Sequence, residues 1–192
     1  MRKFGCPPSK RSLPDEFEET IDYYKQLPIL PTGVPRSKVP RKAHMKMSDV
    51  ELVSFYSERY ADVDVAEFLW KERRNRLYGL CNLVRPDEFY LDVGCADGEH
   101  MDVLYKRGIK GIGLDISVTN IIKGRKKFPH LYFVHGFAED IPFKDGYFDI
   151  VLLGDVLEHV RNPKIVLAEC LRVAKKGVVF CVPIDNRHSE EH

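Results

Sequence analysis

The sequence predicts an α/β fold in which helices cover both faces of a doubly wound parallel sheet. Short, nearly continuous apolar runs recur from residue 89 to residue 182, and segments with an apolar repeat near 3.6 residues separate them. The first run passes into a glycine-rich turn at residues 94–98 and then into a helical pattern. Sheets of this kind bind ligands at the carboxyl ends of their strands, near the point where the strand order reverses.

Five strands and four helices are expected in the second half of the chain. The strands are expected at 89–93, 109–115, 131–135, 147–153 and 177–182. The helices are expected at 99–107, 117–127, 155–160 (a short one) and 163–174.

The chain divides into three parts by composition. These are a proline-rich basic extension at 1–47, helices that pack on the core at 48–84, and the strand-and-helix domain at 85–192. The extension carries a net charge of +5 and the rest of the chain −4, which fits a solvated tail or an arm for an anionic partner.

Local signals place helices before the first strand. Ser48 followed by Glu51 is a capping box, so a helix is expected to begin near residue 48. A second helix is expected at about 65–83, and Pro14 and Pro28 bracket a candidate helix at 15–27.

Composition limits the class of protein. A chain of 192 residues can bury one sizeable core, and no apolar run reaches the roughly 20 residues of a membrane span. The N-terminus lacks the apolar segment of a secretory signal, and the five cysteines form no C-x-x-C pair. We therefore expect a cytoplasmic protein.

The stretch from Phe89 to Gly98 has the order strand, glycine turn, helix, which cradles nucleotides in many proteins. It is not the dinucleotide pattern G-x-G-x-x-G, because Ala96 and Glu99 stand where glycines are needed. The acid Asp97 within the turn suits a ligand with cationic groups better than a pyrophosphate.

This stretch resembles motif I of the class I S-adenosylmethionine-dependent methyltransferases, D-x-G-x-G-x-G, with Ala96 in place of the middle glycine. The resemblance implies a Rossmann-like fold, methyltransferase activity and S-adenosyl-L-methionine as cofactor. It implies cofactor contacts at Asp92, Gly94, Cys95, Ala96, Gly98, Asp115, Ile116, Phe137, Ala138 and Gly154.

Asp115 ends the second expected strand, 21 residues after Gly94. That is about the spacing at which a Rossmann-like unit places a carboxylate on ribose hydroxyls. The alternative is an N-cap for the next helix, although Ser117 is better placed for that role.

The segment after the third strand, from His135 to Phe143, resembles the family's adenine-binding loop, G-D-A-x-x-L-P-F. Phe137 stands where the family has an aspartate that accepts from the adenine amino group. Adenine would then stack on the aromatic ring or bind the backbone of Ala138 and Glu139.

The segment Gly154–Val160 resembles the fourth motif of small-molecule methyltransferases, including those of ubiquinone and menaquinone biosynthesis. His159 is the candidate general base and Asp155 the second catalytic candidate; the alternative for His159 is a helix-terminal residue packed on the core. Asp155, Glu158 and His159 would share one helical face, so a metal site is a further alternative, with His188 and His192 as the late candidate ligands. No metal is included in our expectation.

The family's sheet has two further strands, a C-terminal hairpin, but only nine residues follow Pro183 here. The expected fifth strand would then be an open edge, covered by the N-terminal segment, an absent tail or a homodimer partner. We expect a small-molecule O or N acceptor and no membrane partner. The alternatives are a non-catalytic scaffold with a methyltransferase fold and an RNA methyltransferase, but we do not expect nucleic acid binding, since the basic run at 123–127 fits a helix end.

Overall fold

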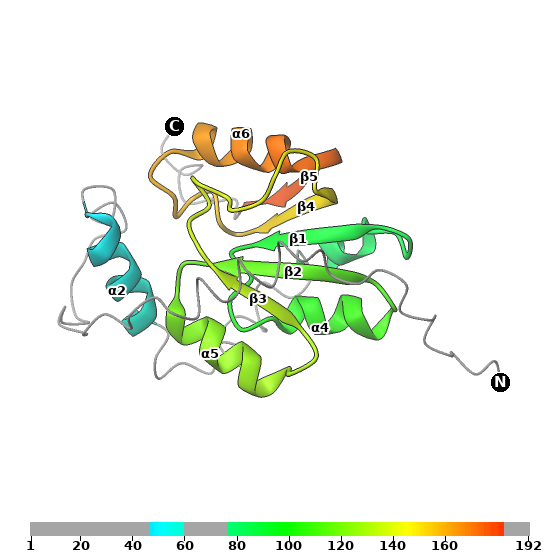
Figure 1. The fold of residues 1–192 in the computed structure, drawn as a ribbon, viewed down its shortest axis with the longest axis horizontal. Coiled ribbons are helices and arrows are strands. Elements are labelled where there is room, and N and C mark those ends of the chain that lie inside the picture. Colours follow the sequence, from blue (N-terminus) through cyan, green and yellow to red (C-terminus); the bar gives the residue numbers. More distant parts are fainter. Residues whose placement is uncertain (1–46, 60–76, 183–192) are drawn as a thin grey trace, which may run out of the picture.

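A computed structural model describes residues 47–59 and 77–182 (Figure 1). Within these ranges five parallel strands form one sheet in the order β3-β2-β1-β4-β5. The strands are β1 (Phe89–Val93), β2 (Lys110–Asp115), β3 (Tyr132–His135), β4 (Phe148–Gly154) and β5 (Ala174–Cys181). The helices are α2 (Asp49–Arg59), α4 (Glu99–Lys106), α5 (Val118–Lys127) and α6 (Pro163–Val173), and residues 77–82 are also helical. The predicted α/β architecture is confirmed.

Helices cover both faces of the sheet, as Figure 1 shows: α6 lies on one side and α4 and α5 on the other. One core cluster joins the α6 side to β1, β2 and β4 through Leu91, Leu114, Val151 and Val166. The other contains Tyr90, Met101, Ile121 and Phe133 on the opposite face. β4 alternates its side chains between the two clusters, with Val151 and Leu153 in the first and Ile150 and Leu152 in the second, which explains why this strand is apolar almost throughout.

The strand order reverses at β1, because the chain runs outward through β2 and β3 and then returns to β4 on the other side. At this point the carboxyl ends of β1 and β4 lie side by side, with Val93 paired to Leu153. This is the switch point at which a ligand was expected.

Capping residues fix the starts of the helices. Ser48 and Glu51 form the expected capping box, with the Ser48 amide 2.8 Å from Glu51 Oε2. Ser117 Oγ accepts from the Asn120 amide at 3.2 Å at the start of α5, and Asn162 precedes Pro163 at the start of α6. Sequence signals therefore placed these three starts to within about a residue.

β5 begins at Ala174, three residues before the predicted start. The lysines after Ala174 read as a loop in sequence, but each pairs with an acid from a neighbouring segment. Lys175 Nζ lies 3.5 Å from Asp149 and Lys176 Nζ 3.1 Å from Glu88. In the described chain β5 pairs only with β4, so it is an edge of the sheet.

Some expectations fall outside the described residues. These are the helix at 15–27, the first part of the helix at 65–83 and the C-terminal histidines His188 and His192. The described helices include none long and apolar enough to cross a membrane.

Candidate functional site

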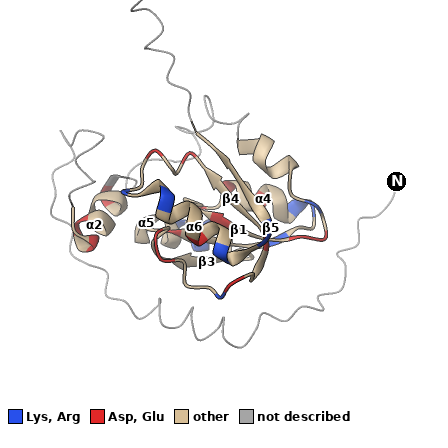
Figure 2. Ribbon diagram, turned by 90° about the horizontal axis from the view of Figure 1, so that it is seen from above, with Lys and Arg blue, Asp and Glu red and all other residues tan. Residues whose placement is uncertain are grey.

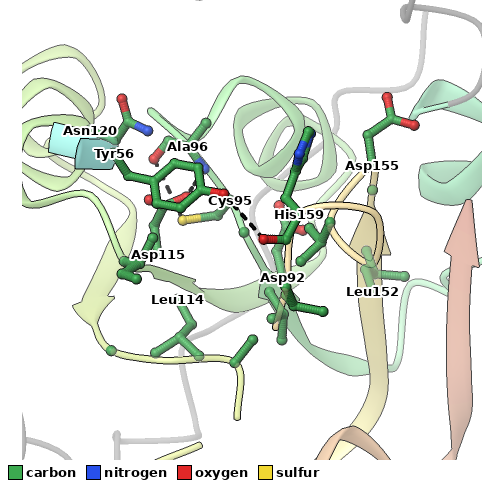
Figure 3. A pocket seen from close by; sticks show the side chains of 18 of the residues that line it. Tyr56, Asp92, Cys95, Ala96, Leu114, Asp115, Asn120, Leu152, Asp155 and His159 are labelled. Atoms are coloured by element: carbon green, nitrogen blue, oxygen red, sulfur yellow. Dashed lines mark hydrogen bonds between the residues drawn. The ribbon is translucent and has the colours of Figure 1, made fainter. Parts of the chain in front are cut away.

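A pocket opens at the carboxyl ends of β1, β2 and β4, and eleven of the twelve residues that we predicted as cofactor-binding or catalytic line it (Figure 3). They are Asp92, Gly94, Cys95, Ala96, Asp115, Ile116, Phe137, Ala138, Gly154, Asp155 and His159. Gly98 does not line the pocket. It begins α4 with a φ of 87°, and a side chain there would overlap the ring of Phe133.

The glycine turn after β1 has the conformation that its small residues permit. Gly94 has a φ of 75°, and a Cβ at this position would collide with Val156 on the loop after β4. Ala96 keeps a left-handed φ of 50° despite its side chain, at the position where the family has glycine. The amides of Gly94 and Cys95 both donate to the Leu114 carbonyl, at 2.7 and 3.2 Å. The turn is thus tied to β2.

Asp115 joins the glycine turn to the start of α5. Its Oδ2 accepts from the Ala96 amide at 2.8 Å, and its Oδ1 accepts from the Ser117 amide at 2.7 Å. Burial raises the pKa of Asp115 to about 6, although the amides of Ser117 and Ala96 oppose that shift. Ser117, not Asp115, caps α5.

Asp92 is the second buried carboxyl of the pocket. Burial, together with the nearby charge of Asp115, raises the pKa of Asp92 to about 7. Two carboxyls held out of water and facing one pocket favour a ligand that brings positive charge or hydroxyl donors. A bound pyrophosphate would be repelled here.

The predicted helix at 155–160 is not formed, and this corrects the interpretation of the fourth motif. Asp155 has a φ of 54°, and residues 157–159 make only a turn. Backbone groups of the segment bind other elements: the Asp155 amide donates to the Cys181 carbonyl of β5 at 3.1 Å. The sequence does not show this, because the competing partners lie far away along the chain.

Because the helix is absent, Asp155, Glu158 and His159 do not share a helical face. His159 Nε2 lies 3.8 Å from Glu158 Oε1, and both side chains are partly exposed. No group of three or more candidate metal ligands occurs within residues 47–59 and 77–182. The metal alternative therefore loses the geometry on which it was based.

Helix α2 holds the loop after β4, which sequence reasoning missed. The Tyr56 hydroxyl donates to the His159 carbonyl at 3.2 Å, as the dashed line in Figure 3 shows. Arg161 binds Asp49 at 2.7 Å, and its amide donates to Glu139 at 3.3 Å. Leu52 and Tyr56 also line the pocket, so α2 forms part of its wall. No local sequence motif predicts the contacts between α2 and the loop after β4.

Two further pocket residues were missed or left without a role. His100 lies in the first turn of α4, and burial lowers its pKa, against the charges of Glu99 and Asp155. Asn120 lies in the first turn of α5 and is almost fully buried.

The basic run at 123–127 is partly used within the protein. Lys127 pairs with Asp97 and Glu99, and Arg125 donates to the Phe133 carbonyl at 2.8 Å. Figure 2 shows basic and acidic positions interleaved along the described elements. Arg125, Lys126 and Lys127 lie in the last turn of α5, where positive charges complement the helix dipole.

Residues of the pocket fit S-adenosyl-L-methionine. Asp92 and Asp115 are acceptors for a cationic ligand with hydroxyl groups, and the absent Cβ of Gly94 keeps the turn close to the loop after β4. Phe137 and Ala138 supply an apolar rim on the side of β3.

Comparison with known proteins finds related methyltransferases. Residues 91–182 match the methyltransferase domain family. The chain is 35% identical over 92 residues to a demethylmenaquinone methyltransferase of Renibacterium salmoninarum, covering 48% of this chain and 39% of the relative. It is 31% identical over 105 residues to a ubiquinone biosynthesis O-methyltransferase of Maricaulis maris, covering 52% and 41%.

Solved structures show the same fold. An S-adenosylmethionine-dependent methyltransferase from Thermotoga maritima superposes with a TM-score of 0.52 at 25% identity, covering 64% of this chain and 58% of that one. The chain thus matches about two fifths of the length of the curated relatives named above. The glycine turn, the acid at the end of β2 and the family match together show that residues 91–182 are a methyltransferase domain of the class I S-adenosylmethionine-dependent kind, whose cofactor is S-adenosyl-L-methionine.

Proposed function

We propose that the protein transfers a methyl group from S-adenosyl-L-methionine to an oxygen or nitrogen of a small molecule by in-line displacement. The observation that carries the proposal is the pocket itself. It brings together two buried carboxyls, a glycine turn and His159 at the switch point of the sheet. The relatives named for demethylmenaquinone and ubiquinone biosynthesis support an acceptor of small size.

Each group in the pocket has a proposed task. Asp115 binds the ribose hydroxyls, Asp92 faces the positively charged part of the cofactor, and Phe137 and Ala138 contact adenine. When bound, the cofactor supplies a methyl group on a sulfonium, so the protein chiefly has to position the acceptor in line. His159 takes the proton of a hydroxyl acceptor, with Asp155 as the second catalytic candidate in the same loop.

Methyl transfer from radiolabelled S-adenosyl-L-methionine to a panel of hydroxyquinols, phenols and amines tests the activity. Replacing His159 by Ala is expected to lower the rate on a hydroxyl acceptor by about 10²–10⁴-fold while leaving S-adenosylhomocysteine affinity unchanged. His130→Ala is the matched control, because His130 lies outside the pocket beside Asp102. Binding of the cofactor without turnover on any acceptor would favour the scaffold alternative.

The RNA alternative predicts a different result. Affinity for RNA would fall steeply as salt rises, because phosphate contacts release counterions. The pairing of Lys127 with Asp97 and Glu99 argues for the small-molecule acceptor. Methylation of RNA, with no methylation of any small molecule in the panel, would overturn the proposal.

Two further parts of the proposal concern the setting of the protein. The buried free thiols of Cys81, Cys95 and Cys170 support a reducing compartment such as the cytoplasm. The edge position of β5 supports pairing with a second copy of the chain, which sedimentation of the full chain tests: a monomer at micromolar concentration would count against it.

A further inference from the structure

We infer that Asn120 is a second ribose-binding residue, which accepts one hydroxyl of the cofactor while Asp115 accepts the other. The inference rests on the proposed cofactor site and adds to it a contact that no motif indicated. It comes from an oxygen atom that the fold leaves without a partner.

Asn120 Oδ1 is buried and has no hydrogen-bond partner, and within residues 47–59 and 77–182 no other buried side-chain oxygen or nitrogen is in that state. The residue is 1% exposed and lines the pocket. A buried acceptor without a donor destabilises the fold, so such an atom calls for a specific reason. A donor brought by the ligand supplies one.

The orientation of the amide is set by its neighbour. The Asn120 side-chain amide donates to the Asp115 carboxylate, which fixes the nitrogen on that side and leaves the oxygen as a free acceptor. The Asn120 backbone amide is already used by Ser117 Oγ at 3.2 Å. In Figure 3, Asn120 and Asp115 lie on the same side of the pocket, across from Asp155.

The Asp115 carboxylate has too few free acceptor positions to bind both ribose hydroxyls. Asp115 already accepts from the amides of Ala96 and Ser117 and from the side chain of Asn120. A carboxylate offers roughly four lone-pair positions, so about one remains for the ligand. The adenosyl ribose presents two hydroxyl donors, and Asn120 Oδ1 is the acceptor that the second one lacks.

The start of α5 is covered by α2, where Ser57 Oγ accepts from the Val118 amide at 3.1 Å. Asn120 Oδ1 is buried, so a local movement is required before a ribose hydroxyl can reach the oxygen. The oxygen is already out of contact with solvent, so a hydrogen bond from a ribose hydroxyl to it contributes favourably to the free energy of binding.

Calorimetry with S-adenosylhomocysteine and its 2′-deoxy and 3′-deoxy analogues tests the inference. The native protein is expected to bind each deoxy analogue about fivefold to tenfold more weakly, because each hydroxyl has its own acceptor. Asn120→Ala is expected to bind S-adenosylhomocysteine about tenfold more weakly and to lose its discrimination against one of the two analogues. Thr119→Ala, the neighbouring residue outside the pocket, is the matched control and keeps the native pattern.

The outcomes separate the two proposals. If the native protein binds S-adenosylhomocysteine and both deoxy analogues with the same affinity, the role of Asn120 is overturned while the cofactor site stands. This result needs only the native protein, so it decides the question even if Asn120→Ala does not fold. An Asn120→Ala variant with native affinity and native discrimination also overturns that role. Native protein that binds none of the three ligands overturns the proposed function itself.

Discussion

The two halves of the pocket are built in different ways. On the β1 and β2 side, hydrogen bonds among residues 94–120 close the site, and the Ala96 amide reaches Asp115 only 19 positions away. On the β4 side, Tyr56 reaches His159 over 103 positions and Arg161 reaches Asp49 over 112. We expect the glycine turn and Asp115 to keep their shape when the N-terminal helix is perturbed, whereas the second half and the start of α5, which Ser57 of α2 contacts, depend on that helix.

The largest loss is expected from Asp115→Ala. This change removes the ribose acceptor and also releases the amides of Ala96 and Ser117. Hydrogen bonds to a charged group contribute about 1.5–3 kcal/mol each, so S-adenosylhomocysteine affinity should fall at least about 100-fold in calorimetry. Asp145→Ala, at an exposed ion pair with Arg172 away from the pocket, should bind as the native protein does. Equal losses in both variants would contradict the role of Asp115.

The carboxyl of Asp92 should give binding and stability opposite pH dependences. Its pKa is raised to about 7, and the pKa of Asp115 to about 6, by burial. As pH falls through 7 the folded protein takes up a proton that the unfolded chain does not yet bind. The free energy of unfolding of the ligand-free protein should therefore rise from pH 8 toward pH 5.

Binding of the cationic cofactor requires the ionised carboxylate, so its affinity should be about tenfold lower at pH 6 than at pH 8. Asp92→Asn should flatten both profiles and should stabilise the ligand-free protein at pH 8, because a buried charge is removed. Denaturant melts and calorimetry across this range give the two slopes. Slopes of the same sign would refute the assignment.

A smaller effect is expected in the β4 half. Tyr56→Phe removes the hydroxyl that holds the His159 carbonyl, a hydrogen bond worth about 0.5–1.5 kcal/mol. Methyl transfer should slow several-fold while S-adenosylhomocysteine affinity stays within about twofold. Tyr132→Phe, at an exposed tyrosine of β3, is the control. A loss of cofactor affinity without a loss of rate would contradict the assignment of Tyr56 and His159 to the catalytic half of the pocket.

The smallest effect is expected from Ser48→Ala. The change removes the capping box of α2 and should lower the stability of that helix by about 1 kcal/mol. Hydrogen exchange should quicken within Asp49–Arg59 and remain unchanged around Ala96 and Asp115. Faster exchange in both places would show that the two halves are coupled.

The same contrast explains how much could be predicted from the sequence. The glycine turn, the position of Asp115 at the end of β2 and the starts of the helices follow from short-range rules of spacing and capping, so the structure confirms where they lie. Residues 155–160 have a helical composition, but their backbone binds distant groups. The Asp155 amide donates to the Cys181 carbonyl, and the His159 carbonyl accepts from the Tyr56 hydroxyl. Tertiary contacts of this kind leave no local pattern.

Asn120 shows a second limit. An asparagine in the first turn of a helix is ordinary in sequence, and only the packing around it reveals an oxygen without a donor. The early start of β5 has a similar origin, because Lys175 and Lys176 depend on acids that other strands and turns supply. Sequence patterns predict the turn and the carboxyls of the proposed cofactor side, whereas packing identifies the residues that complete the pocket.

A crystal structure of the protein with S-adenosylhomocysteine tests the central claim most directly. We predict that the ligand lies at the carboxyl ends of β1, β2 and β4, with its ribose hydroxyls on Asp115 and Asn120 and its adenine beside Phe137 and Ala138. Ligand density elsewhere on the protein, or ribose hydroxyls that contact neither Asp115 nor Asn120, would contradict it.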